Sequence, residues 1–182
     1  VRLTLPFFLH GVYQIEHPES QQLAALVDAV EKERKRKSHL DTVVLHGFSR
    51  STQEDSAIDR LVYAVIAMEA FFLTDGQSEL SHRLAERVAV FWGVTPMERV
   101  SLYGFVKHVY TQRSKLVHGV PLAKLDGKGL DGRPARFGDM VDQFETVLRR
   151  TLNKALAEDN DQSWYLNPKG RWEWLLFGHR TP

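Results

Sequence analysis

The chain has 182 residues, of which 43% are hydrophobic, and it contains no cysteine. This size predicts one domain with a sizeable core, and the absence of cysteine excludes disulfides, thiolate nucleophiles and cysteine-based zinc sites. The formal net charge of +1 favours neither an acidic nor a basic partner, so nucleic-acid binding would require a local basic patch.

The same composition suggests the cellular setting. A cysteine-free chain favours an intracellular, cytoplasmic location over a secreted one. The most apolar stretch, residues 61–73, is shorter than a membrane span and contains Glu69, which predicts a buried helix and no membrane partner. No leader-like pattern follows Val1, and an additional domain upstream of it is compatible with the sequence.

Apolar residues recur every three or four positions along most of the chain, which predicts an all-α helical bundle. The expected helices cover residues 18–37, 51–73, 78–92, 96–118 and 139–157. Residues 1–15 favour a short extended segment, and the aromatic stretch 164–177 is typical of a β-hairpin. We therefore expect an N-terminal segment with one amphipathic helix (1–50), a helical core (51–157) and an aromatic-rich tail packed on the bundle (158–182).

Two segments have the spacing of a capping box, in which a hydroxyl and a carboxylate satisfy each other's free backbone N–H groups. Ser51 with Glu54 predicts the start of the second helix, which is apolar on nearly all sides and is therefore expected at the centre of the bundle. Thr95 with Glu98, and Pro96 at the first helical position, predict the start of the fourth helix.

Glycines are expected to end two of these helices. Gly93 should stop the third helix in the left-handed conformation, and Gly119 should stop the fourth, which places His118 in its last turn. The fourth helix is expected to direct five residues towards the core: Val100, Tyr103, Val106, Val109 and Tyr110. Residues 123–138 are rich in Gly, Asp and Lys, which predicts a mobile surface loop.

Familiar catalytic motifs are missing from the sequence. It has no Gly-x-x-x-x-Gly-Lys loop, no His-Glu-x-x-His helix and no Gly-x-Ser-x-Gly elbow. The histidines are scattered and form no cluster with carboxylates at ligand spacing, so we expect no metal site and no cofactor.

The remaining candidate is Arg113, which is followed five positions later by His118. This Arg-x-x-x-x-His spacing is weak evidence by itself, because Arg34 and His39 repeat it inside a solvated charge run. The copy at 113–118 has different surroundings, since it closes a helix with a clear start, lies among apolar residues and is followed by Gly119.

Residues 110–119 resemble the signature of the Apea-like branch of the HEPN family, with a tyrosine, an Arg-Ser-Lys run, an aliphatic pair and a His-Gly pair. Residues 67–70 resemble that family's Ala-x-Glu-Ala helix, and residues 79–87 resemble its next helix. The resemblance covers roughly residues 50–157. Many HEPN domains have Asn, Asp or His after the arginine; Ser114 departs from that pattern but agrees with the Apea-like branch.

The resemblance implies a homodimeric helical bundle and a metal-independent endoribonuclease, in which Arg and His residues from both subunits meet at the dimer cleft. Under this hypothesis Arg113 holds a phosphate by two parallel hydrogen bonds and His118 transfers a proton. RNA supplies its own nucleophile, the 2′-hydroxyl. The family further suggests a role in antiviral defence or in a toxin system.

Helix geometry makes the second subunit part of this hypothesis. Residues five apart are separated by about 140° around the helix axis, so one helix does not aim both side chains at one point. His118 at the end of the helix also faces the negative end of its dipole, which suits a general acid.

Supporting roles are predicted for Tyr110, one turn before the arginine, and for Ser114, which shares a helix face with His118. Glu69 is either a site carboxylate or, as is commoner for a charge in an apolar helix, the buried partner of an arginine, for which the candidates are Arg83, Arg87 and Arg113.

A weaker set of basic residues can follow an RNA backbone, although such runs are more often solvated helix ends: Lys32, Arg34, Lys35, Arg36, Lys37 and Lys115. Trp164, Trp172 and Trp174 can stack on bases, but packing on the bundle is the favoured role. Two alternatives to the enzyme stay open. One is a non-catalytic HEPN module for RNA or protein binding and dimerisation, and the other is a plain helical interaction domain.

Overall fold

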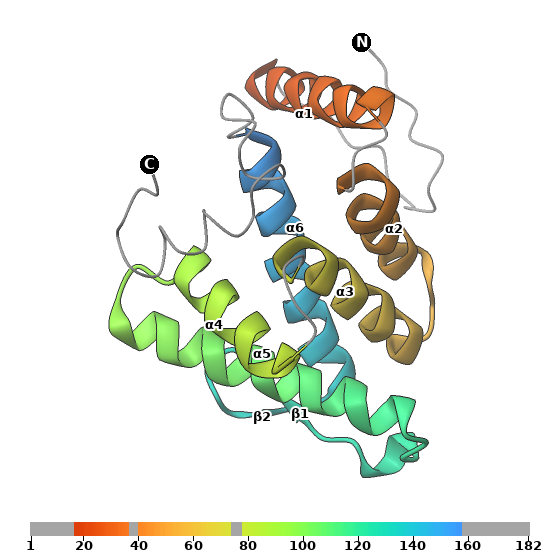
Figure 1. The fold of residues 1–182 in the computed structure, drawn as a ribbon, viewed down its shortest axis with the longest axis vertical. Helices are drawn as coiled ribbons and strands as arrows, with labels where there is room; N and C mark the ends of the chain where they lie inside the picture. Colours follow the sequence, from red (N-terminus) through yellow and green to blue (C-terminus); the bar gives the residue numbers. More distant parts are fainter. Residues whose placement is uncertain (1–16, 37–39, 74–77, 158–182) are drawn as a thin grey trace.

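The protein is an all-α helical bundle, as the hydrophobic spacing predicts (Figure 1). The computed structural model describes residues 17–36, 40–73 and 78–157. Its helices are α1 (His17–Arg36), α2 (His46–Gln53), α3 (Ala57–Phe72), α4 (Leu80–Trp92), α5 (Pro96–Val117) and α6 (Phe137–Ala157). Short elements complete the order: a π-helical turn η1 (Leu40–Leu45), a 3-10 turn η2 (Leu122–Lys124), and strands β1 (Gly127–Lys128) and β2 (Pro134–Ala135).

Helix α3 lies at the centre, which confirms the prediction from its apolar circumference. It contacts α2, α4, α5, α6 and η1. Its buried residues point to several sides of the helix: Leu61, Ala64, Val65, Ala67, Met68, Phe71 and Phe72. Gly47 of α2 permits the closest approach, because a Cβ atom there would lie 3.1 Å from the Cβ of Ala67.

An aromatic cluster joins α3 to α4. The rings of Phe71, Phe72 and Phe91 meet edge to face, with centroids 4.8 to 6.2 Å apart. The predicted apolar stripe of α6 is buried against this core along its whole length: Met140, Phe144, Val147, Leu148, Leu152 and Leu156.

The start predicted for the second helix is wrong. Ser51 lies inside α2, where its side chain is buried and its hydroxyl donates to the carbonyl of Phe48 at 2.9 Å. The central helix begins six residues later at Ala57, with Ser56 as the N-cap that accepts from the backbone N–H of Asp59. Helix α2 spans the boundary expected between residues 50 and 51.

The capping box at Thr95 is confirmed in full. Its hydroxyl accepts from the backbone N–H of Glu98 at 3.2 Å, and the Glu98 carboxylate accepts from the N–H groups of Thr95 and Val94. These backbone donors hold the pKa of Glu98 below its ordinary value. The pair fixes the residue at which α5 begins.

Gly93 ends α4 for a reason other than the predicted one. Its φ is −76°, outside the left-handed region. A Cβ atom at this position would lie 2.4 Å from the Cγ of Arg99 and 2.7 Å from the carbonyl of Ala89. The side chain of Arg99 donates to the Gly93 carbonyl at 2.8 Å, so glycine is needed for close packing of the α4–α5 turn.

Val100 is the exception among the five core residues predicted for α5. Val106 and Val109 are buried and both tyrosines are half-buried, but Val100 is 72% exposed. The helix instead buries Leu102, Phe105, Val106, Val109 and Gln112. Val100 falls on the side of α5 away from the core.

The segment between α5 and α6 is more ordered than a mobile loop. Strands β1 and β2 pair antiparallel, with Gly127 opposite Ala135 and Lys128 opposite Pro134. Gly132 turns the hairpin at a φ of +81°, and α6 begins at Phe137, two residues before the predicted start.

Several expectations fall outside the described residues. They are the extended segment at 1–15, the Asp75-Gly76 helix stop, and the tail with its hairpin at 158–182. Within the described helices, none combines the length and the apolar content needed to cross a membrane.

Candidate functional site

The C-terminal end of α5 forms a Schellman motif, which fixes the backbone around His118. The N–H of Gly119 donates to the carbonyl of Leu116 and the N–H of Val120 donates to that of Lys115, both at 2.9 Å. Gly119 adopts a φ of +78°, as predicted. His118 therefore caps the helix one residue after its last turn, and its side chain is exposed.

Arg113 lies one and a half turns earlier on the same helix, and it is half-buried. Its Nε is shielded from solvent and has no hydrogen-bond partner within the described part of the chain. A buried N–H without an acceptor costs about 1–3 kcal/mol, and more on a charged group. Such a group is uncommon in a folded protein and marks Arg113 for a role beyond packing.

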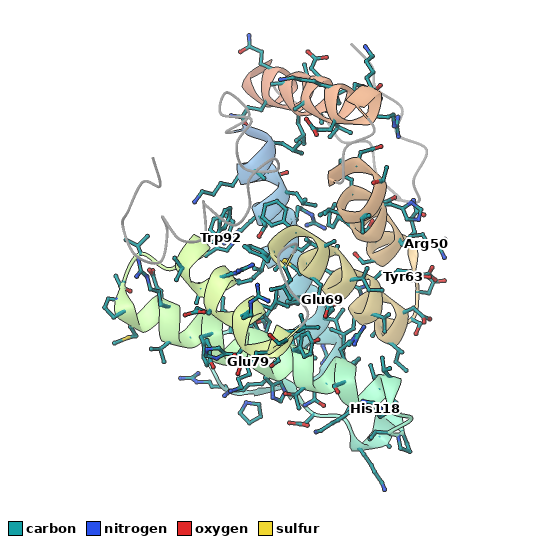
Figure 2. The ribbon with its side chains drawn as sticks, viewed as in Figure 1. Arg50, Tyr63, Glu69, Glu79, Trp92 and His118 are labelled. Atoms are coloured by element: carbon teal, nitrogen blue, oxygen red, sulfur yellow. The ribbon has the colours of Figure 1, made fainter. Side chains whose placement is uncertain are left out.

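Tyr110 and Glu69 form a polar pair beside Arg113. The Tyr110 hydroxyl donates to the Glu69 carboxylate at 2.9 Å and joins α5 to α3. Burial, together with Glu69, raises the pKa of Tyr110 to about 12, while the positive charge of Arg113 acts in the opposite direction. The hydrogen-bond partner found for Glu69 is thus this tyrosine, and Figure 2 shows the carboxylate at the interior of the bundle.

The single chain does not join Arg113 and His118 by any contact that the structure records among the described residues. The arginine is held half-buried, whereas the histidine is exposed at the helix end (Figure 2). Five residues of α-helix separate them by about 7.5 Å along the axis and about 140° around it. Ser114 shares the His118 face and accepts the backbone N–H of His118 on its carbonyl at 3.1 Å.

A second polar cluster lies on another face of α5, and the sequence analysis missed it. His108, Gln112 and Lys115 occupy successive turns and all reach Asp126 before β1. The Lys115 ammonium lies 3.2 Å from the Asp126 carboxylate and holds the pKa of Asp126 below its ordinary value. The spacing of 108, 112 and 115 on one helix face was the signal that could have revealed it.

This cluster changes the expected role of Lys115. Its ammonium is engaged by a carboxylate and ties the connecting segment to α5. The buried side chain of Gln112 strengthens the same attachment by accepting from the Asp126 N–H at 3.4 Å.

The basic run of α1 lies far from the motif. Figure 1 places α1 at one end of the molecule and the C-terminal end of α5 at the other. Arg34 pairs with Glu31 of its own helix at 3.0 Å, while Lys35 is exposed. Lys32 is also exposed. Lys37 and the side chain of Arg36 fall outside the described residues.

Comparisons with protein-family models, with curated proteins and with solved structures find no match. Across residues 17–36, 40–73 and 78–157, the structure has no group of three or more His, Asp or Glu side chains able to hold a metal ion.

Proposed function

We propose that this chain is a HEPN-type, metal-independent endoribonuclease domain that cleaves RNA with Arg113 and His118 at the cleft of a homodimer. The observation that carries the proposal is the unpartnered Nε of Arg113, held beside the Tyr110–Glu69 pair on the helix whose end exposes His118. The resemblance of residues 110–119 to the Apea-like signature supports the same roles.

A phosphate is the ligand that best suits this arginine. A guanidinium can bind a phosphate through two parallel, charge-assisted hydrogen bonds. Because the Nε is shielded, the side chain has to turn outward to use it. That movement would exchange an unpaired buried donor for a paired one, which favours binding.

The proposed reaction needs only the RNA and these side chains. The 2′-hydroxyl attacks the adjacent phosphorus, the bond to the 5′-oxygen breaks, and the His118 imidazolium donates a proton to that leaving oxygen. The proton of the 2′-hydroxyl passes to a base, for which the second subunit's histidine is the proposed group. The products are a 2′,3′-cyclic phosphate and a 5′-hydroxyl.

The test is cleavage of mixed RNA in the presence of a chelator, followed by analysis of the new ends. We expect His118→Ala to lower the rate by about 10²–10⁴-fold and Arg113→Ala by about 10²–10³-fold. DNA of the same sequence should resist, because it lacks the 2′-hydroxyl.

The controls are variants of exposed residues elsewhere, His46→Ala and Arg150→Ala, whose activity should match that of the wild type. Circular dichroism would verify that every variant is folded. Undiminished cleavage in both motif variants, or a wild type that never cleaves RNA, would contradict the proposal.

RNA binding without cleavage is a second candidate, favoured by the exposed basic residues of α1 at the end of the molecule away from the motif. It predicts that Arg34→Ala with Lys35→Ala weakens binding and reduces the salt dependence by about 0.7–0.9 per lost phosphate contact. The two motif variants would leave such binding unchanged.

A further inference from the structure

Three apolar side chains stand exposed where α5 begins. Val94, Met97 and Val100 are 85%, 80% and 72% exposed, and we call them the α5 entry patch. The capping box between Thr95 and Glu98 holds the backbone beneath the patch in one conformation. A fixed group of exposed apolar side chains is typical of a surface that another segment covers.

The end of α6 lies close to this patch. The Lys154 ammonium donates to the carbonyl of Phe91 at 3.3 Å and lies over the rings of Phe91 and Trp92. Trp92 in turn donates to the hydroxyl of Thr151 at 3.0 Å, and Figure 2 labels it at the end of α4. The patch starts at Val94, two residues after Trp92, and the described chain ends at Ala157, one turn after Lys154.

The chain that continues from Ala157 has the composition to cover an apolar surface. Residues 158–182 contain eight large apolar or aromatic side chains: Trp164, Tyr165, Leu166, Trp172, Trp174, Leu175, Leu176 and Phe177. An extended chain spans about 3.3–3.6 Å per residue, so both aromatic groups of this segment can reach the patch from the end of α6.

We propose that residues 158–182 dock their aromatic side chains on the α5 entry patch of the same chain. A second copy of the protein fits the patch less well, because three side chains fall short of the roughly 800 Å² that each partner buries in a stable interface. A tethered segment needs far less contact, since a short linker gives an effective concentration on the order of millimolar. This proposal is independent of the ribonuclease activity.

Cysteine cross-linking tests the docking directly, because the natural chain has no cysteine to interfere. One cysteine replaces Glu173, between two tail tryptophans, and the other replaces Ser101, an exposed residue one turn after Met97. The matched control places the second cysteine at Thr111, also exposed on α5 but about 15 Å further along the axis. We expect intramolecular disulfide formation at least about tenfold faster for Ser101→Cys than for Thr111→Cys, as a contact equilibrium shifted by that ratio would give.

A patch variant provides the second readout. Replacing Val94, Met97 and Val100 by serine should reduce the Ser101–Glu173 cross-linking rate to that of the Thr111 control. The three side chains are already exposed, so circular dichroism should show an unchanged fold. Equal rates at the two α5 positions, or cross-links that form only between two chains, would overturn the proposal.

Discussion

The hydrogen bond between Tyr110 and Glu69 links two helices at the side of the candidate site. Its residues are 41 positions apart in the chain. The tyrosine has its pKa raised to about 12, mainly by burial and then by the carboxylate that accepts its proton. The neutral tyrosine is therefore the form that the fold prefers.

This pair predicts a specific loss of stability at high pH. A raised folded-state pKa contributes stability below the unfolded value near 10, and that contribution is lost as the pH rises towards about 12. Between pH 10 and pH 12, the wild type should lose more unfolding free energy than Tyr110→Phe. Urea unfolding at several pH values measures the difference; parallel curves for the two proteins would contradict it.

Arg113 and Arg87 provide a contrast between a functional and a structural arginine. Arg87 is buried and donates to the carbonyl of Phe72, whereas the Nε of Arg113 has no acceptor in the described structure. We expect Arg87→Met to lower stability by about 1–3 kcal/mol, since it leaves a buried carbonyl short of a donor. Arg113→Met should leave stability unchanged or raise it by up to about 1 kcal/mol.

Chemical denaturation of the two methionine variants and the wild type gives this comparison. A large destabilisation by Arg113→Met would show that the arginine serves the fold, and it would remove the main observation behind the proposed phosphate site.

At the scale of the element, two glycines of the α5 region isolate the effect of backbone conformation. A Cβ atom at Gly104 or at Gly119 would meet nothing within 4 Å, so neither substitution by alanine causes a clash. Gly104 lies in the helix interior, while Gly119 has a φ of +78°.

We predict opposite effects of alanine at these positions. Gly104→Ala should stabilise the protein by about 0.5–1 kcal/mol, because alanine loses less backbone entropy in a helix. Gly119→Ala should destabilise it by about 1–2 kcal/mol, because an L-residue is strained in the left-handed region. Thermal unfolding of both variants measures the signs, and a shift in the same direction would be inconsistent with this assignment.

The helix limits show which signals can be read from a sequence. Thr95 and Ser51 both precede a glutamate by three residues, yet only Thr95 caps a helix. Pro96 adds an independent local signal at the first case. Ser51 is instead buried in α2, and this tertiary packing is invisible to a local pattern. The same reason explains Val100, because helical spacing does not show which side of α5 faces the core.

The candidate site follows the same division. Gly119, with the stop that places His118 at the helix end, follows from local chemistry and is predicted correctly. The partner of Glu69 and the attachment of Asp126 to α5 depend on contacts between distant segments. Without an alignment of related sequences, nothing in the local pattern identifies those partners.

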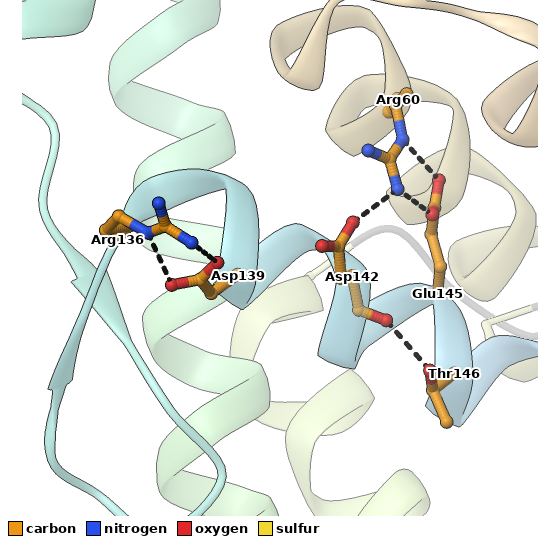
Figure 3. Close-up of polar contacts among 6 residues, drawn as sticks. All are labelled: Arg60, Arg136, Asp139, Asp142, Glu145 and Thr146. Carbon is orange, nitrogen blue, oxygen red and sulfur yellow. Dashed lines mark hydrogen bonds and ion pairs between the residues drawn. The ribbon is translucent and has the colours of Figure 1, made fainter.

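At the scale of the whole molecule, one ionic group fastens α6 to the central helix. Arg60 of α3 contacts both carboxylate oxygens of Glu145 and also pairs with Asp142 at 2.6 Å (Figure 3). Glu145 is only 5% exposed. A buried carboxylate of this kind depends on its partner, since water cannot replace the lost charge.

Removal of Arg60 should therefore be severe. Arg60→Met is expected to lower the unfolding free energy by about 3–5 kcal/mol by leaving Glu145 buried and unpaired. The double variant Arg60→Met with Glu145→Met should recover most of this loss. Arg136→Met is the control, because its pair with Asp139, also seen in Figure 3, is largely exposed at the arginine and should contribute less than about 1 kcal/mol.

Denaturant titrations of these variants measure the differences. If Arg60→Met and Arg136→Met had equal effects, the α3–α6 ion pair would have no special role in joining the helices.

The proposed enzyme is a property of two subunits, and mixing two inactive variants tests this most directly. Arg113→Ala and His118→Ala are unfolded, allowed to exchange partners during refolding in equal amounts, and assayed on RNA with a chelator. A heterodimer would contain one cleft with an intact arginine from one chain and an intact histidine from the other. The mixture should recover about a quarter of the wild-type rate, since half of the dimers are mixed and each has one working cleft. A mixture as inactive as its two components would contradict the shared site.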